Sequence, residues 1–361
     1  MHRFRSTIRT PVKRQGSDQY LLLTLISFAI SITLTRLFLQ LTGYPKLGRG
    51  ELHIAHVLWG GLLLFIASIL PLLIANRWVY VVGAILAGTG VGLFIDEVGK
   101  FITQNNNYFY PLAAPIIYAF FLLTVMLYLR IRRPPSHEPR AELYRAMDAM
   151  EEVLEHDLDP QERDRLEARL RYVAAAPNQP ELSQLASDLL DFLQSEQLTL
   201  VPQRDTLWGK LLEVWRRFEA RWVTERRLRA AIAGGLLALG FMGLVTIVQS
   251  LPIGNDASLQ RQLTHLIQEG QLSGPNGLAW FMARLALETS VGILLLISAG
   301  LLVVGKSRAG IFFGSLSLLL SLTGVNLLVF YFEQFSAIVT ASVQLGLLLT
   351  TAYYRQRYLA P

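Results

Sequence analysis

Of the 361 residues in this chain, 52% are hydrophobic and only 17% are charged, whereas roughly a quarter of the residues are charged in a typical soluble domain. Cysteine is absent, which excludes disulfide bonds, thiolate nucleophiles and cysteine-ligated zinc or iron–sulfur sites. The net charge of +6 does not indicate a nucleic-acid partner, because the basic residues flank apolar segments and form no single patch with interleaved aromatic residues.

The apolar residues occur in blocks about as long as the roughly twenty residues that cross the hydrocarbon core of a bilayer. These blocks predict an all-α, polytopic membrane protein with about eight transmembrane helices in contact with membrane lipid. In chain order, the predicted spans are 20–41, 53–75, 78–101, 110–129, 230–248, 278–304, 310–330 and 335–354. None of them shows a clear interruption at mid-membrane.

Lysine and arginine are distributed unevenly around the predicted spans. They occur in the tail 1–19, at Arg77, in 130–133, and after the sixth and eighth spans, and the predicted topology places all of these positions on one side of the membrane. Cytoplasmic loops carry an excess of these residues in helical membrane proteins. We therefore expect a protein of the cell (inner) membrane with both termini in the cytoplasm. Its first span lacks a small-residue cleavage site, so we expect that span to be retained.

The central segment 134–229 is rich in Glu, Arg, Leu and Ala at amphipathic spacing. Within it, Asp159-Pro160-x-Glu162 combines an N-cap residue, a proline at the first helical position and an acid in the first turn. No phosphate loop, kinase motif or metal motif occurs there. The segment predicts a cytoplasmic helical domain, which could bind a protein partner.

This domain separates a first transmembrane half, 20–133, from a second half, 230–361, which contains a predicted extracytoplasmic loop at 252–276. Residues 89–101 are similar to residues 323–335. Each half would contribute four spans in the same orientation, a pattern typical of a parallel internal duplication. Chance similarity between apolar helices is the alternative, and no pattern indicates the oligomeric state.

A charged residue at the centre of a bilayer costs roughly 2.5–3.5 kcal/mol on the insertion scale, so intramembrane charges usually have a function. Here they are concentrated at the outer ends of the second and third spans, in His53, His56, Asp96, Glu97 and Lys100. Gly88 and Gly92 continue the stripe of Asp96 and Lys100 at a spacing of four. Small residues at this spacing let helices approach closely, so we expect this stripe to face protein.

Three interpretations of this polar cluster are open. His53, His56 and Asp96 could bind a divalent metal, because histidines at i and i+3 and a carboxylate from a neighbouring helix form a common ligand set. The same residues could instead relay protons, since histidine titrates near neutral pH. The cluster could also be structural, with Asp96 paired to Lys100 or to Arg36 and the histidines hydrogen-bonded to loops or water.

In the second half, Arg284 and Glu288 are spaced by four residues and predict a mutual ion pair. The stripe that corresponds to Asp96 and Lys100 carries amides, Asn326 and Gln334. If the duplication is real, these amides belong to a scaffold or to the wall of a binding site. Just outside the third span, residues 105–108 and Tyr110 could cap the polar cluster or form a polar turn with interfacial aromatic residues, and the pattern favours the turn.

Together, these features favour a membrane protein that moves or senses a small solute or ion through an ionisable cluster on the extracytoplasmic side. A second class is an intramembrane metal-dependent hydrolase that acts on lipid, with Glu97 or Asp96 as the base that activates water. A third class is a scaffold or regulatory protein that docks a partner through 134–229. The pattern favours a non-enzymatic role over catalysis.

Overall fold

The computed structural model describes residues 11–43, 55–108, 110–132, 138–177, 179–195, 224–250 and 277–359. All regular structure in these residues is helical, so the predicted all-α class is confirmed for this part of the chain. Seven helical segments are long and apolar enough to cross a membrane, by length and composition. This finding agrees with a multi-pass membrane protein.

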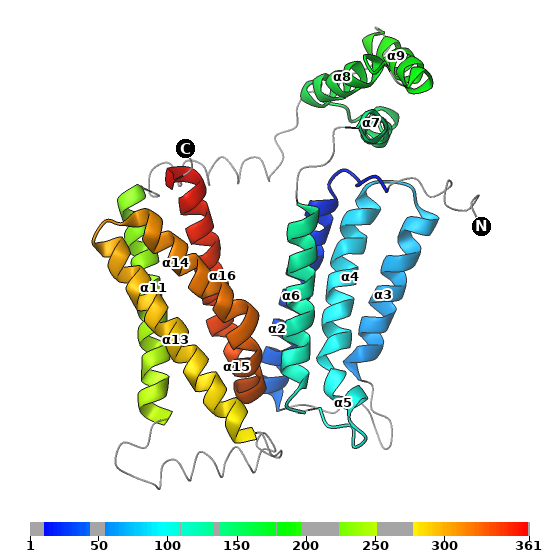
Figure 1. Ribbon diagram of the computed structural model, residues 1–361. Helices are drawn as coiled ribbons and strands as arrows, with labels where there is room; N and C mark the ends of the chain where they lie inside the picture. Colours follow the sequence, from blue (N-terminus) through cyan, green and yellow to red (C-terminus); the bar gives the residue numbers. More distant parts are fainter. Residues whose placement is uncertain are drawn as a thin grey trace, which may run out of the picture. The chain divides into compact units, whose positions relative to one another are not determined.

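Six of the seven segments are single helices that overlap the first six predicted spans. They are α2 (Ser17–Thr42), α3 (His56–Leu73), α4 (Trp78–Asp96), α6 (Ala113–Ile131), α11 (Glu225–Ser250) and α13 (Gly277–Val303) (Figure 1). The helix of the third predicted span is broken at Glu97, and the short α5 (Val98–Ile102) follows this break.

The seventh segment, Ser307–Leu359, has 53 residues, which is more than twice the roughly twenty that one crossing needs. It consists of α14 (Ser307–Leu320), the π-helix η1 (Ser321–Val325), α15 (Asn326–Glu333), the 3-10 turn η2 (Gln334–Ser336), α16 (Ala337–Tyr354) and the π-helix η3 (Arg355–Leu359). At Gln334 the backbone has a φ of +53°, which residues other than glycine rarely adopt. Because α14 and α16 pack against each other, the segment folds back on itself near Gln334.

The described residues form two compact units, and the boundary between them passes through α2, α4 and α6. The first unit contains the described residues of 11–35, 55–93 and 124–195. The second unit contains those of 36–43, 94–123 and 224–359.

In the first unit, glycines of α4 allow α2 and α3 to approach it closely. A Cβ atom at Gly92 would lie 2.7 Å from the Cβ of Ser31 in α2, and one at Gly90 would lie 2.8 Å from the backbone oxygen of Gly60 in α3. The Ser31 hydroxyl also donates a hydrogen bond to the backbone oxygen of Thr89 at 3.0 Å. The predicted small-residue stripe therefore contacts protein at Gly92.

The first unit also contains a bundle of three helices, α7 (Pro139–Leu154), α8 (Pro160–Ala174) and α9 (Pro180–Gln194). Asp159 and Glu162 form a capping box at the start of α8, as their spacing predicts. Leu166, Leu170 and Leu193 are buried between the three helices. The bundle therefore has an apolar core of its own.

Charged side chains connect this bundle to residues that precede the membrane helices. Arg77, between α3 and α4, binds Glu152 of α7 through its guanidinium, and its backbone N–H donates to the Glu151 carboxylate at 2.6 Å. Arg14, before α2, lies 3.8 Å from the carboxylate of Asp148.

The second unit is built around α11, α13, α14, α15 and α16, and it includes the ends of α2 and α4 and the first part of α6. Leu236, Ala299 and Leu318 are fully buried in its core. A Cβ atom at Gly240 of α11 would lie 2.9 Å from the backbone oxygen of Gly292 in α13, so these two helices are in close contact. The charged residues Arg36, Asp96, Arg284 and Glu288 also belong to this unit.

Candidate functional site

Arg36 and Asp96 form a buried ion pair in the second unit. Nε of Arg36 donates to Oδ1 of Asp96 at 2.5 Å, and Nη2 donates to the Asp96 backbone oxygen at 3.1 Å. The other carboxylate oxygen accepts a hydrogen bond from the Tyr108 hydroxyl at 2.6 Å. Asp96 is 0% exposed and Arg36 is 7% exposed. The structure therefore contains the predicted alternative in which Asp96 pairs with Arg36.

Two aromatic rings cover the guanidinium of Arg36. Its Cζ lies 4.3 Å from the ring centroid of Tyr108 and 3.7 Å from that of Phe335. Both distances are within the range in which a cation is attracted by the face of an aromatic ring. Because Phe335 belongs to η2, this contact connects the end of α2 to the turn before α16.

Glu97 lies at the break between α4 and α5, with a φ of −91° and a ψ of 10°. Its carboxylate pairs with Nζ of Lys100 at 3.1 Å. The alternative ion pair between Asp96 and Lys100 is therefore wrong, because the break interrupts the continuous helix that would place these two side chains one turn apart. Within the first cluster, the charges of Arg36, Asp96, Glu97 and Lys100 sum to zero.

Of the three predicted metal ligands, the structure describes His56 and Asp96. His53 lies outside the described residues, and His56 is a half-buried residue at the start of α3 in the first unit. In the part of the chain that the structure describes, no three His, Cys, Asp or Glu side chains gather as a metal site would require. A divalent-metal site of His53, His56 and Asp96 therefore stays a prediction.

A second ionic cluster joins α13 to the end of α15. Nε of Arg284 donates to Oε1 of Glu288 at 3.1 Å, so the structure contains the predicted ion pair. Nη2 of Arg284 also donates to the carboxylate of Glu333. The side chains of Arg284 and Glu288 are 6% and 14% exposed, whereas that of Glu333 is 44% exposed. One guanidinium therefore binds two carboxylates.

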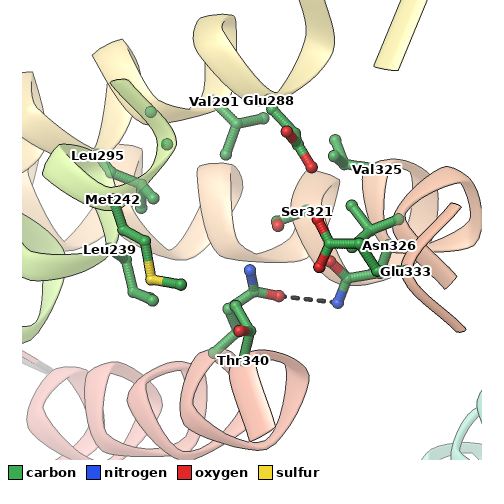
Figure 2. A pocket seen from close by; sticks show the side chains of 14 residues that line it. Leu239, Met242, Glu288, Val291, Leu295, Ser321, Val325, Asn326, Glu333 and Thr340 are labelled. Atoms are coloured by element: carbon green, nitrogen blue, oxygen red, sulfur yellow. Dashed lines mark hydrogen bonds between the residues drawn. The ribbon is translucent and has the colours of Figure 1, made fainter. Parts of the chain in front are cut away.

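Glu288 and Glu333 line a cavity of about 90 Å³ (Figure 2). Its polar wall consists of Glu288, Ser321, Asn326, Glu333, Thr340 and Gln344, contributed by α13, η1, α15 and α16. Figure 2 shows the apolar side chains of Leu239, Met242 and Leu295 on the side opposite to Asn326 and Glu333. The cavity therefore has one apolar side, while its other side combines polar groups with Val325 next to Asn326.

Hydrogen bonds from two other helices hold the cavity wall next to the π-helix η1. The Tyr118 hydroxyl of α6 donates to the backbone oxygen of Leu322 at 2.7 Å, within η1. Directly after η1, Nδ2 of Asn326 donates to Oε1 of Gln344 at 2.8 Å, the dashed line in Figure 2. The Tyr118 ring also stacks on Phe330, with 4.4 Å between the ring centroids. Single π-helical turns of this kind are frequent at functional sites.

The π-helical turn η1 lies inside the seventh predicted span, where it changes the helical hydrogen-bond pattern without breaking the helix. No proline marks the position, so the local sequence does not reveal it. The contacts of Tyr118 with Leu322 and Asn326 stabilise the irregular backbone, and these residues are about two hundred positions apart in the chain.

Ser321 contributes a hydroxyl to the cavity wall. The residue is only 4% exposed, and among the described residues no hydrogen bond partner is found for its hydroxyl. Serine and threonine side chains within helices often bond to the carbonyl one turn earlier, as Ser317 does with Phe313 at 2.8 Å and Thr323 with Leu319 at 2.7 Å. The hydroxyl of Ser321 is therefore available to a molecule in the cavity.

Of the residues predicted for a site, Glu288 and Asn326 line the cavity, and Arg284 binds Glu288 from outside the lining. Gln334 does not line it; its side-chain amide donates to the backbone oxygen of Pro111 at 3.2 Å. Glu333 was not among the residues predicted for a site, although an acidic residue next to an apolar block is a signal that could have revealed it. Tyr108 belongs to the segment that was predicted either to cap the site or to form a polar turn, and its hydroxyl binds Asp96.

The chain matches no model of a known protein family, no curated protein and no solved structure. Its function is therefore inferred from the geometry of the cavity and of the two ionic clusters.

Proposed function

We propose that this chain is a multi-pass membrane protein that binds a small solute or ion in the cavity of its second unit, in order to transport or to sense it. The observation that supports this proposal is the pair of carboxylates, Glu288 and Glu333, at a cavity inside a bundle of apolar helices. Carboxylates in such surroundings are costly and are usually retained for a function. Small-molecule sites are mostly apolar cavities with a few convergent polar groups.

This proposal moves the site away from the predicted cluster at the ends of the second and third spans. Arg36 and Asp96 bind each other, and so do Glu97 and Lys100, with equal numbers of positive and negative charges. A role in holding α2, α4 and η2 together accounts for these residues. The cluster around Arg284 has an excess carboxylate and faces a cavity, so it is the better candidate for binding.

The proposed protein crosses the cell (inner) membrane eight times, with both termini in the cytoplasm. The segment Ser307–Leu359 supplies two of these crossings, because it folds back near Gln334. The contact of Arg77 with Glu152 supports a cytoplasmic position for the bundle of α7, α8 and α9, since Arg77 is one of the positive charges that define the cytoplasmic side. In this topology the cavity lies towards the extracytoplasmic side, near the turn at Gln334.

Single-cysteine variants test whether solutes reach the cavity, because the chain contains no cysteine that would react instead. In proteoliposomes, Ser321→Cys should react rapidly with a small, water-soluble methanethiosulfonate reagent. Ser298→Cys is the matched control, because Ser298 is 0% exposed and its hydroxyl donates to the backbone oxygen of Gly310 at 2.6 Å. The control should react only after unfolding.

The labelling also separates transport from sensing. Reaction of Ser321→Cys with reagent added to either side of the membrane would favour transport, which requires alternating access to one site. Reaction from one side only would favour sensing. If Ser321→Cys and Ser298→Cys react at the same rate, or neither reacts, the cavity is not accessible to solutes and the proposed function is wrong.

A second candidate function is partner docking through the bundle of α7, α8 and α9. Large apolar side chains, among them Tyr144, Leu154 and Phe192, are exposed on this bundle, and exposed apolar side chains that form a patch mark interaction sites. In native membranes, a crosslinker attached to Leu154→Cys should trap one defined protein. Crosslinking from Glu181→Cys, at the start of α9, serves as the control; equal yields of the same products from both positions would contradict a specific docking site.

A further inference from the structure

The negative charge that faces the cavity is only partly neutralised. Glu288 and Glu333 line the cavity, whereas Arg284, which binds both, is not among the described residues that line it. No other Lys, Arg or His side chain is found in the described lining either. When both carboxylates are ionised, the three charges sum to −1. Surroundings of low dielectric constant strengthen the attraction of this charge for a cation and its repulsion of an anion.

The volume of the cavity indicates how large the enclosed part of a bound molecule can be. Its volume of about 90 Å³ is smaller than that of an engineered apolar cavity of about 150 Å³ that admits benzene. A whole sugar, nucleotide or lipid headgroup therefore does not fit inside it. Small amines and their methylated or short-chain derivatives remain within this volume.

The two sides of the cavity require a molecule with two different ends. Beside the carboxylates, the Ser321 hydroxyl offers an acceptor that has no partner among the described residues, and the Thr340 hydroxyl is a further lining group. Leu239, Met242 and Leu295 form the opposite side. A bound molecule therefore meets hydrogen-bond acceptors at one end and hydrocarbon at the other.

We propose that the cavity binds a small organic cation, namely an ammonium group that carries a short alkyl chain. This proposal rests on the proposed function and names the class of its solute. The ammonium N–H groups donate to the carboxylates of Glu288 and Glu333 and to the Ser321 hydroxyl. The alkyl chain packs against the apolar side, where its burial contributes about 0.8 kcal/mol for each CH₂ group in general.

An inorganic cation fits this lining less well. Hard cations such as Ca²⁺ take about six to eight oxygen ligands around their whole surface, whereas one side of this cavity consists of aliphatic and thioether side chains. A molecule with an apolar part can contact both sides of the cavity. A neutral alcohol of the same shape would leave the excess negative charge without a counter-ion.

The test measures the melting temperature of the detergent-purified full chain with n-propylammonium chloride, because a ligand that binds the folded state raises this temperature. We expect an increase of several degrees at millimolar concentration, with a smaller increase for methylammonium chloride. Sodium chloride at equal ionic strength, sodium propionate and n-propanol should have no such effect. Glu288→Gln should weaken the binding of n-propylammonium by about tenfold or more.

Two further variants keep the test decisive if Glu288→Gln does not fold. Glu333→Gln changes a half-exposed side chain and should also weaken binding, whereas Glu97→Gln, the same change in the first cluster, should leave it unaltered. Equal stabilisation by sodium chloride, or equal binding to the wild type and to Glu333→Gln, would overturn the assignment of an organic cation. If Ser321→Cys is still labelled in that case, only the solute class is wrong; if it is not labelled, the proposed function fails as well.

Discussion

The two ionic clusters of the second unit differ in charge balance and in their surroundings. In the first cluster, Arg36 binds Asp96 between two aromatic rings, and Glu97 binds Lys100. In the second cluster, Arg284 binds two carboxylates, both of which line a cavity. The charges of the four residues in the first cluster sum to zero, while those of the second cluster sum to −1 when both carboxylates are ionised.

This difference shows that a charged residue in an apolar helix does not by itself identify a binding site. Charge inside a membrane needs a partner, and once the partner is present a structural role is sufficient. In the second cluster, one of the two carboxylates that share Arg284, that of Glu288, is buried, while that of Glu333 is half exposed, and both line the cavity. Uncompensated charge together with a cavity is therefore the better criterion for a site.

The largest effect on stability is expected from neutralising Asp96 in the first cluster. Asp96→Asn leaves the guanidinium of Arg36 buried without a counter-ion, and breaking one partner of a buried pair costs about 3–5 kcal/mol. The free energy of unfolding, measured by circular dichroism in detergent micelles, should fall by this amount. The double variant Arg36→Leu/Asp96→Leu should recover most of the loss, because it leaves no buried charge.

A loss below about 1 kcal/mol for Asp96→Asn, the usual value for an exposed ion pair, would contradict the comparison. It would mean that Arg36 reaches water or another acid when Asp96 is neutral. The stability of the first cluster would then not depend on the pair of Arg36 and Asp96.

A smaller effect is expected for the same chemical change in the second cluster. In Glu288→Gln, Arg284 keeps the carboxylate of Glu333 as a partner, and the charges of the cluster become balanced. We expect a loss of no more than about 1.5–3 kcal/mol in the free energy of unfolding, the range of a single hydrogen bond to a charged group. The measurement is the same as for Asp96→Asn, and a larger loss than for that variant would reverse the comparison between the clusters.

The apolar spans and the local pairs could be predicted from the sequence, because both depend on spacing within one helix. The pair of Arg284 and Glu288 and the capping box of Asp159 and Glu162 are of this kind. The partners Glu333 and Tyr108 could not be predicted, since they come from other elements and no local spacing relates them to Arg284 or Asp96. The irregular backbone at η1 is stabilised from α6, so it also leaves no local signal.

Two serine substitutions test whether the cavity hydroxyl is free to bind. Ser298→Ala should destabilise the protein by about 1 kcal/mol, because it removes a buried hydrogen bond to the Gly310 backbone oxygen. Ser321→Ala should change the free energy of unfolding by less than about 0.5 kcal/mol, since its hydroxyl forms no bond within the described residues. An equal loss for both variants would mean that the Ser321 hydroxyl is already engaged.

A further small effect is expected outside the membrane-spanning segments, at Glu152 in the bundle of α7, α8 and α9. Burial is the largest influence on this carboxyl group and raises its pKa; repulsion by Glu162 adds to this, while the attraction of Arg77 opposes it. For Arg77, burial alone would lower the pKa, but the attraction of Glu152 raises it overall. At Glu152, burial and Glu162 therefore outweigh the attraction of Arg77, whereas at Arg77 the attraction of Glu152 and other acidic groups outweighs burial.

The direction of the pH dependence follows from the raised pKa of Glu152. Above the ordinary glutamate pKa of about 4.3, and up to the raised value, the folded state binds more protons at this group than the unfolded state does. Its contribution to stability therefore falls as the pH rises through this window. Glu152→Gln should remove this decrease and should alter the free energy of unfolding at neutral pH by no more than about 1 kcal/mol. If the variant instead becomes progressively less stable than the wild type as the pH rises, the attraction of Arg77 outweighs burial at Glu152. The pair of Arg77 and Glu152 then stabilises the bundle, as the pair of Arg36 and Asp96 stabilises the first cluster.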